Sequence, residues 1–239
     1  LIPKNVADVF SQETEGADCI EVRLDYLDDP TASKGIEWRN LAAPAIATCR
    51  GRDQGGQFVG SIADELKILE RAVHNGARFV DVDYRFASQF SAAEVIGSYH
   101  DFDSTPKDLE GLLDAVCRSP VAVAKIATFV RTWADNRRLL QLLEKSWPKP
   151  VIIIGMGPMG QMTRIVGPSR GSALTYTAAG GRSAPGQLTL RELIDTYRFR
   201  EIARSTRLLG IVGNPVDHSQ SPLLHNRAFQ AEGLDCVYM

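Results

Sequence analysis

A single lysine lies in the middle of an apolar segment, Val121-Ala-Val-Ala-Lys-Ile-Ala-Thr128. A strand this apolar is typical of a parallel sheet that is buried on both faces. Burial disfavours the charged ammonium, and a neutral amine attacks carbonyl carbon, as in enzymes that form Schiff bases. A lysine that reaches solvent from a strand end is the commoner case. The prediction for Lys125 therefore depends on the residues of the neighbouring strands.

An acid/base candidate, His100, lies on the preceding apolar segment. Imine chemistry requires proton transfers, and a positioned general acid/base contributes roughly 10²–10⁴ in rate. A core histidine with a purely structural role is the alternative. The other histidines have no metal-ligand spacing, so we predict no metal site.

Carboxylate-binding candidates come later in the chain, at Arg164 and in Ser183-Ala-Pro-Gly-Gln187. An arginine fork suits a carboxylate, and hydroxyl and amide donors on a tight turn can share it. A surface arginine is the alternative for Arg164 taken alone.

A glycine pattern, Gly155-Met-Gly-Pro-Met-Gly160, matches the dinucleotide fingerprint G-x-G-x-x-G. It follows the seventh strand of a series rather than the first, and no acidic residue ends a strand about twenty residues later. Small residues that let a substrate approach are therefore the favoured interpretation, and an oxidoreductase using this loop is the minor one.

The elements that must position these residues alternate between short strands and amphipathic helices. With the stub Leu1-Ile-Pro-Lys, which resembles the tail of a strand, we expect eight strands, the others being 19–26, 45–50, 79–84, 95–102, 121–128, 151–156 and 174–179. Apolar stripes predict helices at 66–73, 106–118 and 190–197, with Thr105 as a predicted N-cap and a capping box from Thr189 to Glu192.

Alternation within the strands separates two architectures. Polar residues share one face of several strands: Glu21, Arg23 and Asp25; Thr48 and Arg50; Asp81 and Asp83; Ser98 and His100. An open doubly wound sheet has helices on both faces and does not easily house these charges, whereas a barrel can place them inside. We therefore predict a (β/α)₈ TIM barrel over 1–197.

The character of the chain changes after Tyr197. A basic stretch, 198–207, reads as a linker, and 208–239 reads as the truncated start of a second α/β domain. Some 32 residues are too few for a core of their own, so we expect this segment to be mobile or to lean on a neighbour.

Composition excludes several classes of protein. The 239 residues have a net charge of −2 and 44% hydrophobic residues, which favours neither a nucleic-acid nor a membrane-surface partner. The cysteines (Cys19, Cys49, Cys117 and Cys236) are scattered, which indicates reduced residues and a cytoplasmic location.

Five ordered motifs resemble type I 3-dehydroquinate dehydratases: Glu21-Val-Arg-Leu-Asp25, Thr48-Cys-Arg50, Ser98-Tyr-His-Asp-Phe102, Lys125-Ile-Ala127 and Ser183-Ala-Pro-Gly-Gln187. The resemblance implies a TIM barrel of the shikimate pathway that dehydrates 3-dehydroquinate to 3-dehydroshikimate. It implies a Schiff base on Lys125, proton transfer by His100 and no cofactor. It further implies that Arg164, Ser183 and Gln187 hold the substrate carboxylate, and that Glu21, Arg23 and Arg50 hold its hydroxyls.

One departure concerns the loop after the strand 45–50. The family usually has an acidic residue before its paired glycines, near the catalytic histidine, whereas Gln54 precedes Gly55 and Gly56 here. An amide can orient an imidazole but does not stabilise imidazolium as a carboxylate does. Asp53 is the predicted substitute.

The trailing segment, Gly210 to Pro222 with His225 and Asn226, resembles the start of shikimate dehydrogenase. In that family the serines matching Ser219 and Ser221 bind the substrate carboxylate, and NADP is expected only in a full-length dehydrogenase. We therefore predict a dehydratase that converts no 3-dehydroshikimate with NADPH, and possible pairing as a homodimer. The alternatives are a lysine-dependent class I aldolase and a non-catalytic barrel that scaffolds the dehydrogenase.

Overall fold

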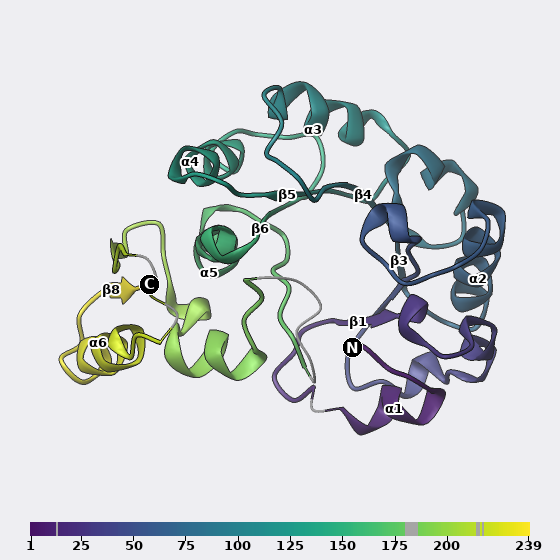
Figure 1. Cartoon of the computed structure of the whole chain (residues 1–239), viewed down its shortest axis with the longest axis horizontal. Coiled ribbons are helices and arrows are strands. Elements are labelled where there is room, and N and C mark those ends of the chain that lie inside the picture. Colours follow the sequence, from purple (N-terminus) through teal and green to yellow (C-terminus); the bar gives the residue numbers. More distant parts are fainter. Residues whose placement is uncertain (13, 180–185, 214–215, 217) are drawn as a thin grey trace.

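The computed structural model describes residues 1–12, 14–179, 186–213, 216 and 218–239. A parallel sheet of six strands in the order β1-β2-β3-β4-β5-β6 forms the centre of the molecule. Its strands are β1 (Ile20–Arg23), β2 (Ala45–Thr48), β3 (Phe79–Asp83), β4 (Glu94–Asp101), β5 (Val123–Phe129) and β6 (Val151–Met156). The sheet curls through about half of a barrel, and helices follow its outer side (Figure 1).

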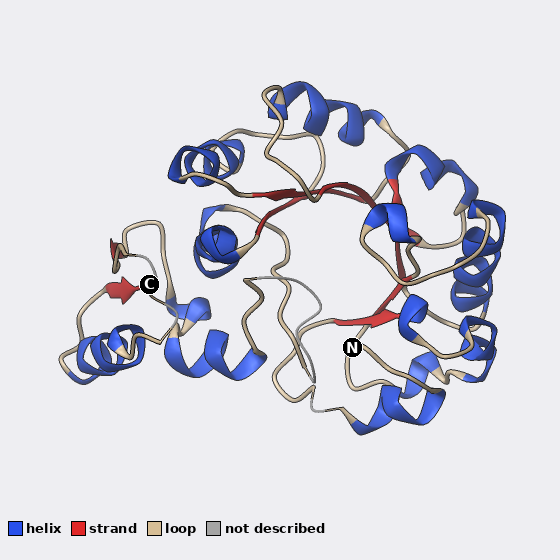
Figure 2. Cartoon of the chain, viewed as in Figure 1, coloured by secondary structure: helices blue, strands red, loops and turns tan. Residues whose placement is uncertain are grey.

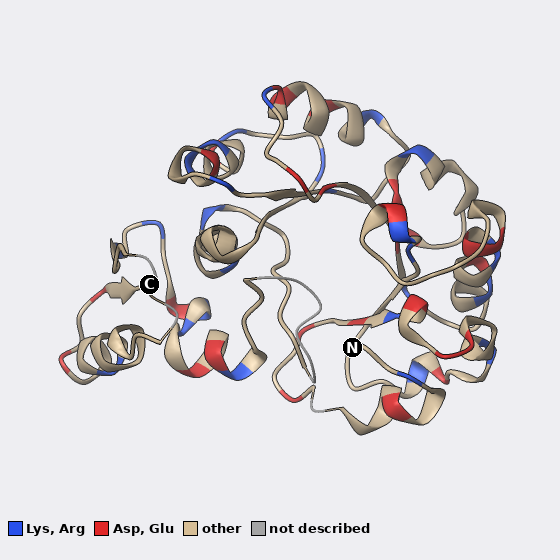
Figure 3. Ribbon diagram, viewed as in Figure 1, with Lys and Arg blue, Asp and Glu red and all other residues tan. Residues whose placement is uncertain are grey.

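Side chains cap the first turns of α1 to α4, whereas α5 and α6 begin without a side-chain cap. They are α1 (Val6–Ser11), α2 (Ile62–His74), α3 (Leu109–Arg118), α4 (Trp133–Leu142), α5 (Gln161–Arg170) and α6 (Ser221–Ala231). Thr132 and Asp135 form a capping box at α4. The predicted N-cap Thr105 is wrong, because the Asp108 side chain caps α3 at Gly111 and the Thr105 hydroxyl donates instead to the Phe129 carbonyl. Acidic and basic residues are interspersed along α2, α3 and α4 (Figure 3).

The barrel prediction is confirmed for the curled parallel sheet and needs correction for the number of strands. The segment 174–179, predicted as a strand, has only an isolated bridge between Ala178 and Thr189. At the other edge, the Leu1 ammonium donates to the Glu21 carbonyl, and the Arg23 amide donates to the Leu1 carbonyl, but no strand forms. Loops therefore fill the space between β6 and β1 (Figure 2).

Two apolar layers enclose the sheet. The large outer core packs strand residues such as Val22, Val80 and Ile126 against the helices. A smaller inner cluster lies on the concave face and contains Ile46, Ile96, Ala127, Ile152, Ile154 and Met156. The polar side chains of the sheet lie on this concave face as well, which is the arrangement that the alternation predicted.

The C-terminal part packs on the barrel. Strands β7 (Arg207–Leu209) and β8 (Cys236–Tyr238) form a parallel pair beside α6. Val237 is 2% exposed and belongs to one apolar cluster with residues of α5 and of the segment that follows it: Ile165, Val166, Leu188, Leu193, Tyr197 and Ile202. The segment therefore leans on its neighbour, as its small size led us to expect. The predicted capping box is present, because the Thr189 amide donates to Glu192, at the start of a π-helical turn, Glu192–Thr196.

Candidate active site

Lys125 lies inside the curled sheet on β5 and is 5% exposed. Its Nζ donates to Asp81 Oδ2 at 2.7 Å and lies 3.9 Å from the centre of the Tyr176 ring. Burial lowers the pKa of Lys125, although the carboxylates of Asp81 and Glu21 oppose this effect. The side chain is therefore closer to the free-amine state than an exposed lysine.

Asp81 joins two cations at the centre of the site. Its side chain is fully buried, and Oδ1 accepts from Arg50 Nη2 at 2.6 Å while Oδ2 accepts from Lys125. Burial alone would raise the pKa of Asp81, but Arg50 and Lys125 outweigh it and hold the pKa below its usual value. Asp81 is not among the site residues predicted from the sequence. The signal was available, because Asp81 alternates with apolar residues on β3 and so faces inward.

His100 contacts the same arginine. Arg50 Nη1 lies 2.6 Å from His100 Nδ1 and 2.7 Å from Nε2, and the His100 ring stacks on Phe102 at a centroid distance of 5.9 Å. Burial lowers the pKa of His100 well below its ordinary value, and the charges of Arg50, Lys125 and Arg23 act in the same direction. A neutral imidazole can accept a proton, which is what a general base requires.

The register of the strands places His100 and Lys125 near each other. Ser98 pairs with Lys125 and His100 pairs with Ala127 across β4 and β5. His100 is thus one inward position further toward the carboxyl ends of the strands, where active sites of barrel enzymes lie.

Glu21 and Arg23 lie on β1 at the edge of this cluster. Glu21 Oε1 accepts from the Thr48 hydroxyl at 2.9 Å. Burial would raise the pKa of Glu21, but the positive charges of Lys125 and Arg23 dominate and lower it. The Arg23 guanidinium instead makes two hydrogen bonds to the buried Asp25, of 2.9 and 2.7 Å.

Two of the predicted carboxylate-binding residues, Arg164 and Gln187, lie in the described part of the chain, and both are buried. Arg164, on α5, is 4% exposed, and its Nη1 donates to the Tyr176 carbonyl at 3.1 Å. Its Nε is buried without a partner among the described residues, and burial lowers the pKa of Arg164 to about 10. Gln187 is buried nearby, whereas Ser183 lies outside the described residues.

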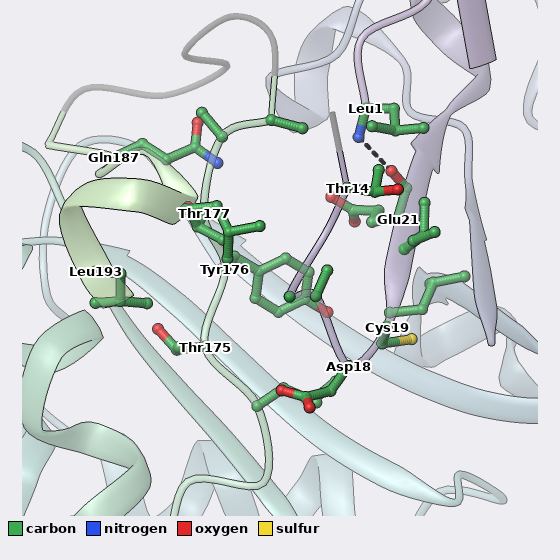
Figure 4. A pocket seen from close by; sticks show the side chains of 18 of the residues that line it. Leu1, Thr14, Asp18, Cys19, Glu21, Thr175, Tyr176, Thr177, Gln187 and Leu193 are labelled. Carbon is green, nitrogen blue, oxygen red and sulfur yellow. Dashed lines mark hydrogen bonds between the residues drawn. The ribbon is translucent and has the colours of Figure 1, made fainter. Parts of the chain in front are cut away.

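A cavity of about 180 Å³ lies between β1 and the segment 173–179. Glu21, Arg23, Gln187 and Tyr176 line it, as Figure 4 shows for three of them. Lys125 and His100 are not in its lining. Tyr176 lines the cavity and also contacts Lys125, so the Tyr176 ring lies between the cavity and Lys125.

The loop after β2 reaches His100 through Phe102. Gly55 has φ 70°, and a Cβ there would lie 2.3 Å from the Phe102 ring, so only glycine fits this approach. Within the described residues no hydrogen bond joins Gln54 or Asp53 to His100, whose polar neighbour is Arg50. The structure therefore does not bring Asp53 into the role predicted for it.

The glycines of the loop from Gly155 to Gly160 serve backbone packing. Gly157 has φ 82°, and a Cβ on Gly160 would lie 2.4 Å from the Gly155 carbonyl carbon. The loop thus forms the tight connection from β6 to α5, the helix that carries Arg164.

In the C-terminal part, the Ser219 hydroxyl accepts from the Ser221 amide at 3.2 Å at the start of α6. These two serines lie far along the chain from Lys125, in the part of the chain that carries the two-stranded sheet of β7 and β8. Over the described ranges no group of three or more metal-ligating side chains occurs, and no described helix is long and apolar enough to cross a membrane.

Two known protein families match successive parts of the chain. Residues 4–204 match the family described as type I 3-dehydroquinase. The chain belongs to this family. Residues 211–239 match the shikimate dehydrogenase substrate binding domain, so a dehydroquinase is followed by the start of a dehydrogenase.

Relatives of both kinds occur. The chain is 34% identical to a bifunctional 3-dehydroquinate dehydratase/shikimate dehydrogenase of Arabidopsis thaliana, covering all of this chain and 42% of that protein. It is 32% identical to a 3-dehydroquinate dehydratase of Methanococcus maripaludis, covering 83% of this chain and 97% of that protein. The chain thus spans less than half of the plant relative and nearly all of the archaeal one.

Solved structures of the family are similar in fold. The type I 3-dehydroquinate dehydratase of Clostridium difficile aligns with a TM-score of 0.72 and 26% identity over 83% of this chain and 89% of that one. The dehydroquinate dehydratase and shikimate dehydrogenase structure from S. pombe aligns with a TM-score of 0.68 and 27% identity over all of this chain and half of that one. The type I dehydroquinases are TIM barrels, and they need no cofactor.

Proposed function

We propose that this chain dehydrates 3-dehydroquinate to 3-dehydroshikimate through an imine on Lys125. The observation that carries the proposal is the buried Lys125 on β5, which Asp81 and Arg50 connect to the half-buried His100 on β4. Burial disfavours the ammonium form of Lys125, so its position favours a chemical role over a structural one. Family membership favours this reaction over an aldolase or a non-catalytic barrel.

The reaction begins with attack by the neutral amine of Lys125 on the C3 carbonyl carbon. The carbinolamine loses its hydroxyl as water and becomes a protonated imine. His100 takes the C2 proton, and the electron pair of the C–H bond moves toward the imine nitrogen. His100 then returns this proton to the departing C1 hydroxyl, which leaves as water. Hydrolysis of the imine releases the product and restores the amine.

Binding of the substrate is assigned to two groups of residues. Arg164, Gln187 and Ser183 are the proposed carboxylate site, because a buried guanidinium whose Nε has no partner among the described residues is suited to an anion. Glu21, Arg23 and Arg50 are the proposed hydroxyl site. Asp81 is added as the group that holds Lys125 and Arg50 in place.

Borohydride reduction tests the mechanism. With 3-dehydroquinate present, borohydride should leave a stable adduct on the peptide that contains Lys125. Lys125→Ala should abolish both the adduct and the new enone absorbance of the product. Lys67→Ala, a change at an exposed lysine of α2, is the control and should alter neither. An adduct on another lysine would exclude the proposed mechanism.

The dehydrogenase segment is proposed to belong to a longer bifunctional enzyme in which NADP is the hydride donor and Ser219 and Ser221 bind the substrate. We expect residues 1–239 alone to catalyse no NADPH-dependent reduction of 3-dehydroshikimate. The homodimer, the cytoplasmic location and the absence of nucleic-acid and membrane partners remain predictions.

A further inference from the structure

Tyr176 contacts the candidate nucleophile and the candidate carboxylate site at once. Its ring face lies 3.9 Å from Lys125 Nζ, and its backbone carbonyl accepts from Arg164 Nη1 at 3.1 Å. It also lines the cavity that Glu21 and Gln187 share (Figure 4). A residue in this position touches whatever occupies the cavity.

The hydroxyl of Tyr176 is buried and has no hydrogen-bond partner among the described residues. Leaving a buried polar group unpaired costs about 1–3 kcal/mol, and native proteins rarely do so without a reason. Burial raises the pKa of Tyr176 well above its ordinary value, and the negative charges of Asp81 and Glu21 raise it further. The phenol is therefore protonated at neutral pH and has a hydrogen to donate.

The surroundings of this hydroxyl favour one class of ligand group. A ligand carboxylate there would face the ionised Glu21 and Asp81, whose pKa values are both lowered. A ligand hydroxyl can accept from Tyr176 and donate to Glu21 at the same time. Glu21 has capacity for this bond, because a carboxylate has about four acceptor sites and Thr48 donates to Oε1.

We propose that Tyr176 is a specificity-determining residue whose phenol donates a hydrogen bond to a ring hydroxyl of the substrate, while that hydroxyl donates to Glu21. The inference rests on the proposed dehydration of 3-dehydroquinate and names one further contact in it. The ring of Tyr176 has a separate effect, because its face stabilises a cation at the Lys125 nitrogen in both the ammonium and the protonated imine.

The test is Tyr176→Phe in the full chain, which removes the hydroxyl and keeps the ring against Lys125. One buried hydrogen bond contributes about 1 kcal/mol, so kcat/KM for 3-dehydroquinate should fall roughly 5- to 10-fold. The borohydride adduct should still form on Lys125. Two analogues of the substrate, one lacking the C4 hydroxyl and one lacking the C5 hydroxyl, identify the contact. For the analogue that lacks the contacted hydroxyl, the variant and the parent chain should have the same kcat/KM.

Tyr197→Phe provides a control, because Tyr197 is a buried tyrosine that belongs to the apolar cluster around Val237. It should leave kcat/KM unchanged. The inference is wrong if Tyr176→Phe has the same kcat/KM for 3-dehydroquinate as the parent chain. It is also wrong if the variant loses the same factor in kcat/KM with both analogues. In either case the proposed dehydration stands. If the parent chain forms neither adduct nor enone, the proposed function fails first.

Discussion

Lys125 Nζ and Asp81 Oδ2 lie 2.7 Å apart inside the sheet, and both side chains are almost completely buried. The same carboxylate binds Arg50, which in turn contacts His100. A single carboxylate thus fixes the positions of the three basic groups of the candidate site.

Asp81→Asn should impair stability and chemistry together. The change leaves Lys125 and Arg50 buried without their shared anion, and removing one partner of a buried ion pair typically costs about 3–5 kcal/mol. The pKa of Lys125 should fall further, because Asp81 opposes its lowering. Denaturant unfolding and adduct formation measure the two effects. Asp83→Asn is the control, since Asp83 pairs with the exposed Arg85 and should cost about 1 kcal/mol or less.

His100→Ala should lower kcat by about 10²–10⁴ while substrate still binds, because it removes a proton-transfer group rather than a binding charge. Steady-state kinetics with 3-dehydroquinate measure this. His74→Ala, at the end of α2, should leave kcat unchanged. A turnover near that of the parent chain would assign the proton transfer to another residue.

Arg164→Ala should chiefly raise KM, because a carboxylate clamp acts in the ground state and the transition state alike. The side chain is buried and binds the Tyr176 carbonyl, so some loss of stability should accompany the change. Arg170→Ala on the same helix is the control for helix and charge effects. A fall in kcat with KM unchanged would contradict the assignment to carboxylate binding.

Glu65→Gln should stabilise the protein at pH 8 and have little effect at pH 4. Burial raises the pKa of Glu65 to about 7, although a backbone hydrogen bond from Gly51 and the charge of Arg50 oppose this; Asp53 and Asp25 add to the increase. The folded state then binds more protons than the unfolded state between about pH 4.5 and 7, so stability falls as pH rises through this window.

Thermal unfolding across this pH range measures the effect. The glutamine variant should lose the pH dependence and melt about 2–4 °C above the parent chain at pH 8 for each kcal/mol gained. Glu70→Gln, at an exposed position of α2, is the control. If the melting temperature of Glu65→Gln and that of the parent chain change with pH by the same slope between pH 4.5 and 7, Glu65 does not titrate there.

Val237→Ala should weaken the dehydratase although Val237 lies in the dehydrogenase segment. The side chain is 2% exposed and packs in one cluster with Ile165 and Val166, which follow Arg164 on α5. Loss of two buried methyl groups should cost about 1–3 kcal/mol of unfolding free energy and raise KM. Val212→Ala, at a position 82% exposed, should change neither. Two separate unfolding transitions would contradict this coupling.

Much of the fold followed from alternation along the strands. The inward placement of Thr48, Arg50, His100 and Lys125 came from period-two patterns, and these residues do lie on the concave face. Segment 174–179 has the same strand-like composition, but a strand also needs a partner edge, and composition does not specify one. Its role as a loop beside the cavity depends on tertiary context.

Site residues that belong to a recognisable motif could be predicted from the sequence. Site residues whose role depends on a contact between distant segments could not. Asp81 lies in no recognised motif, and its importance comes from meeting Lys125 and Arg50 across strands. Glu65 reads as a surface residue in an amphipathic helix, yet its carboxyl is buried behind Arg50. Asp53 lies next to the expected acidic position, but its carboxylate lies against Gly51, and within the described residues it makes no hydrogen bond to His100.

Four charged side chains lie together inside the sheet: Glu21, Asp81, Arg50 and Lys125. They carry two negative and two positive charges when all four groups are ionised. A protonated imine on Lys125 retains the positive charge at the same nitrogen. The covalent intermediate would therefore preserve the electroneutrality of the protein interior, and the surrounding dipoles would need little reorientation as it forms. The carboxylates of Asp81 and Glu21, which balance the ammonium of Lys125, would balance the imine nitrogen in the same way.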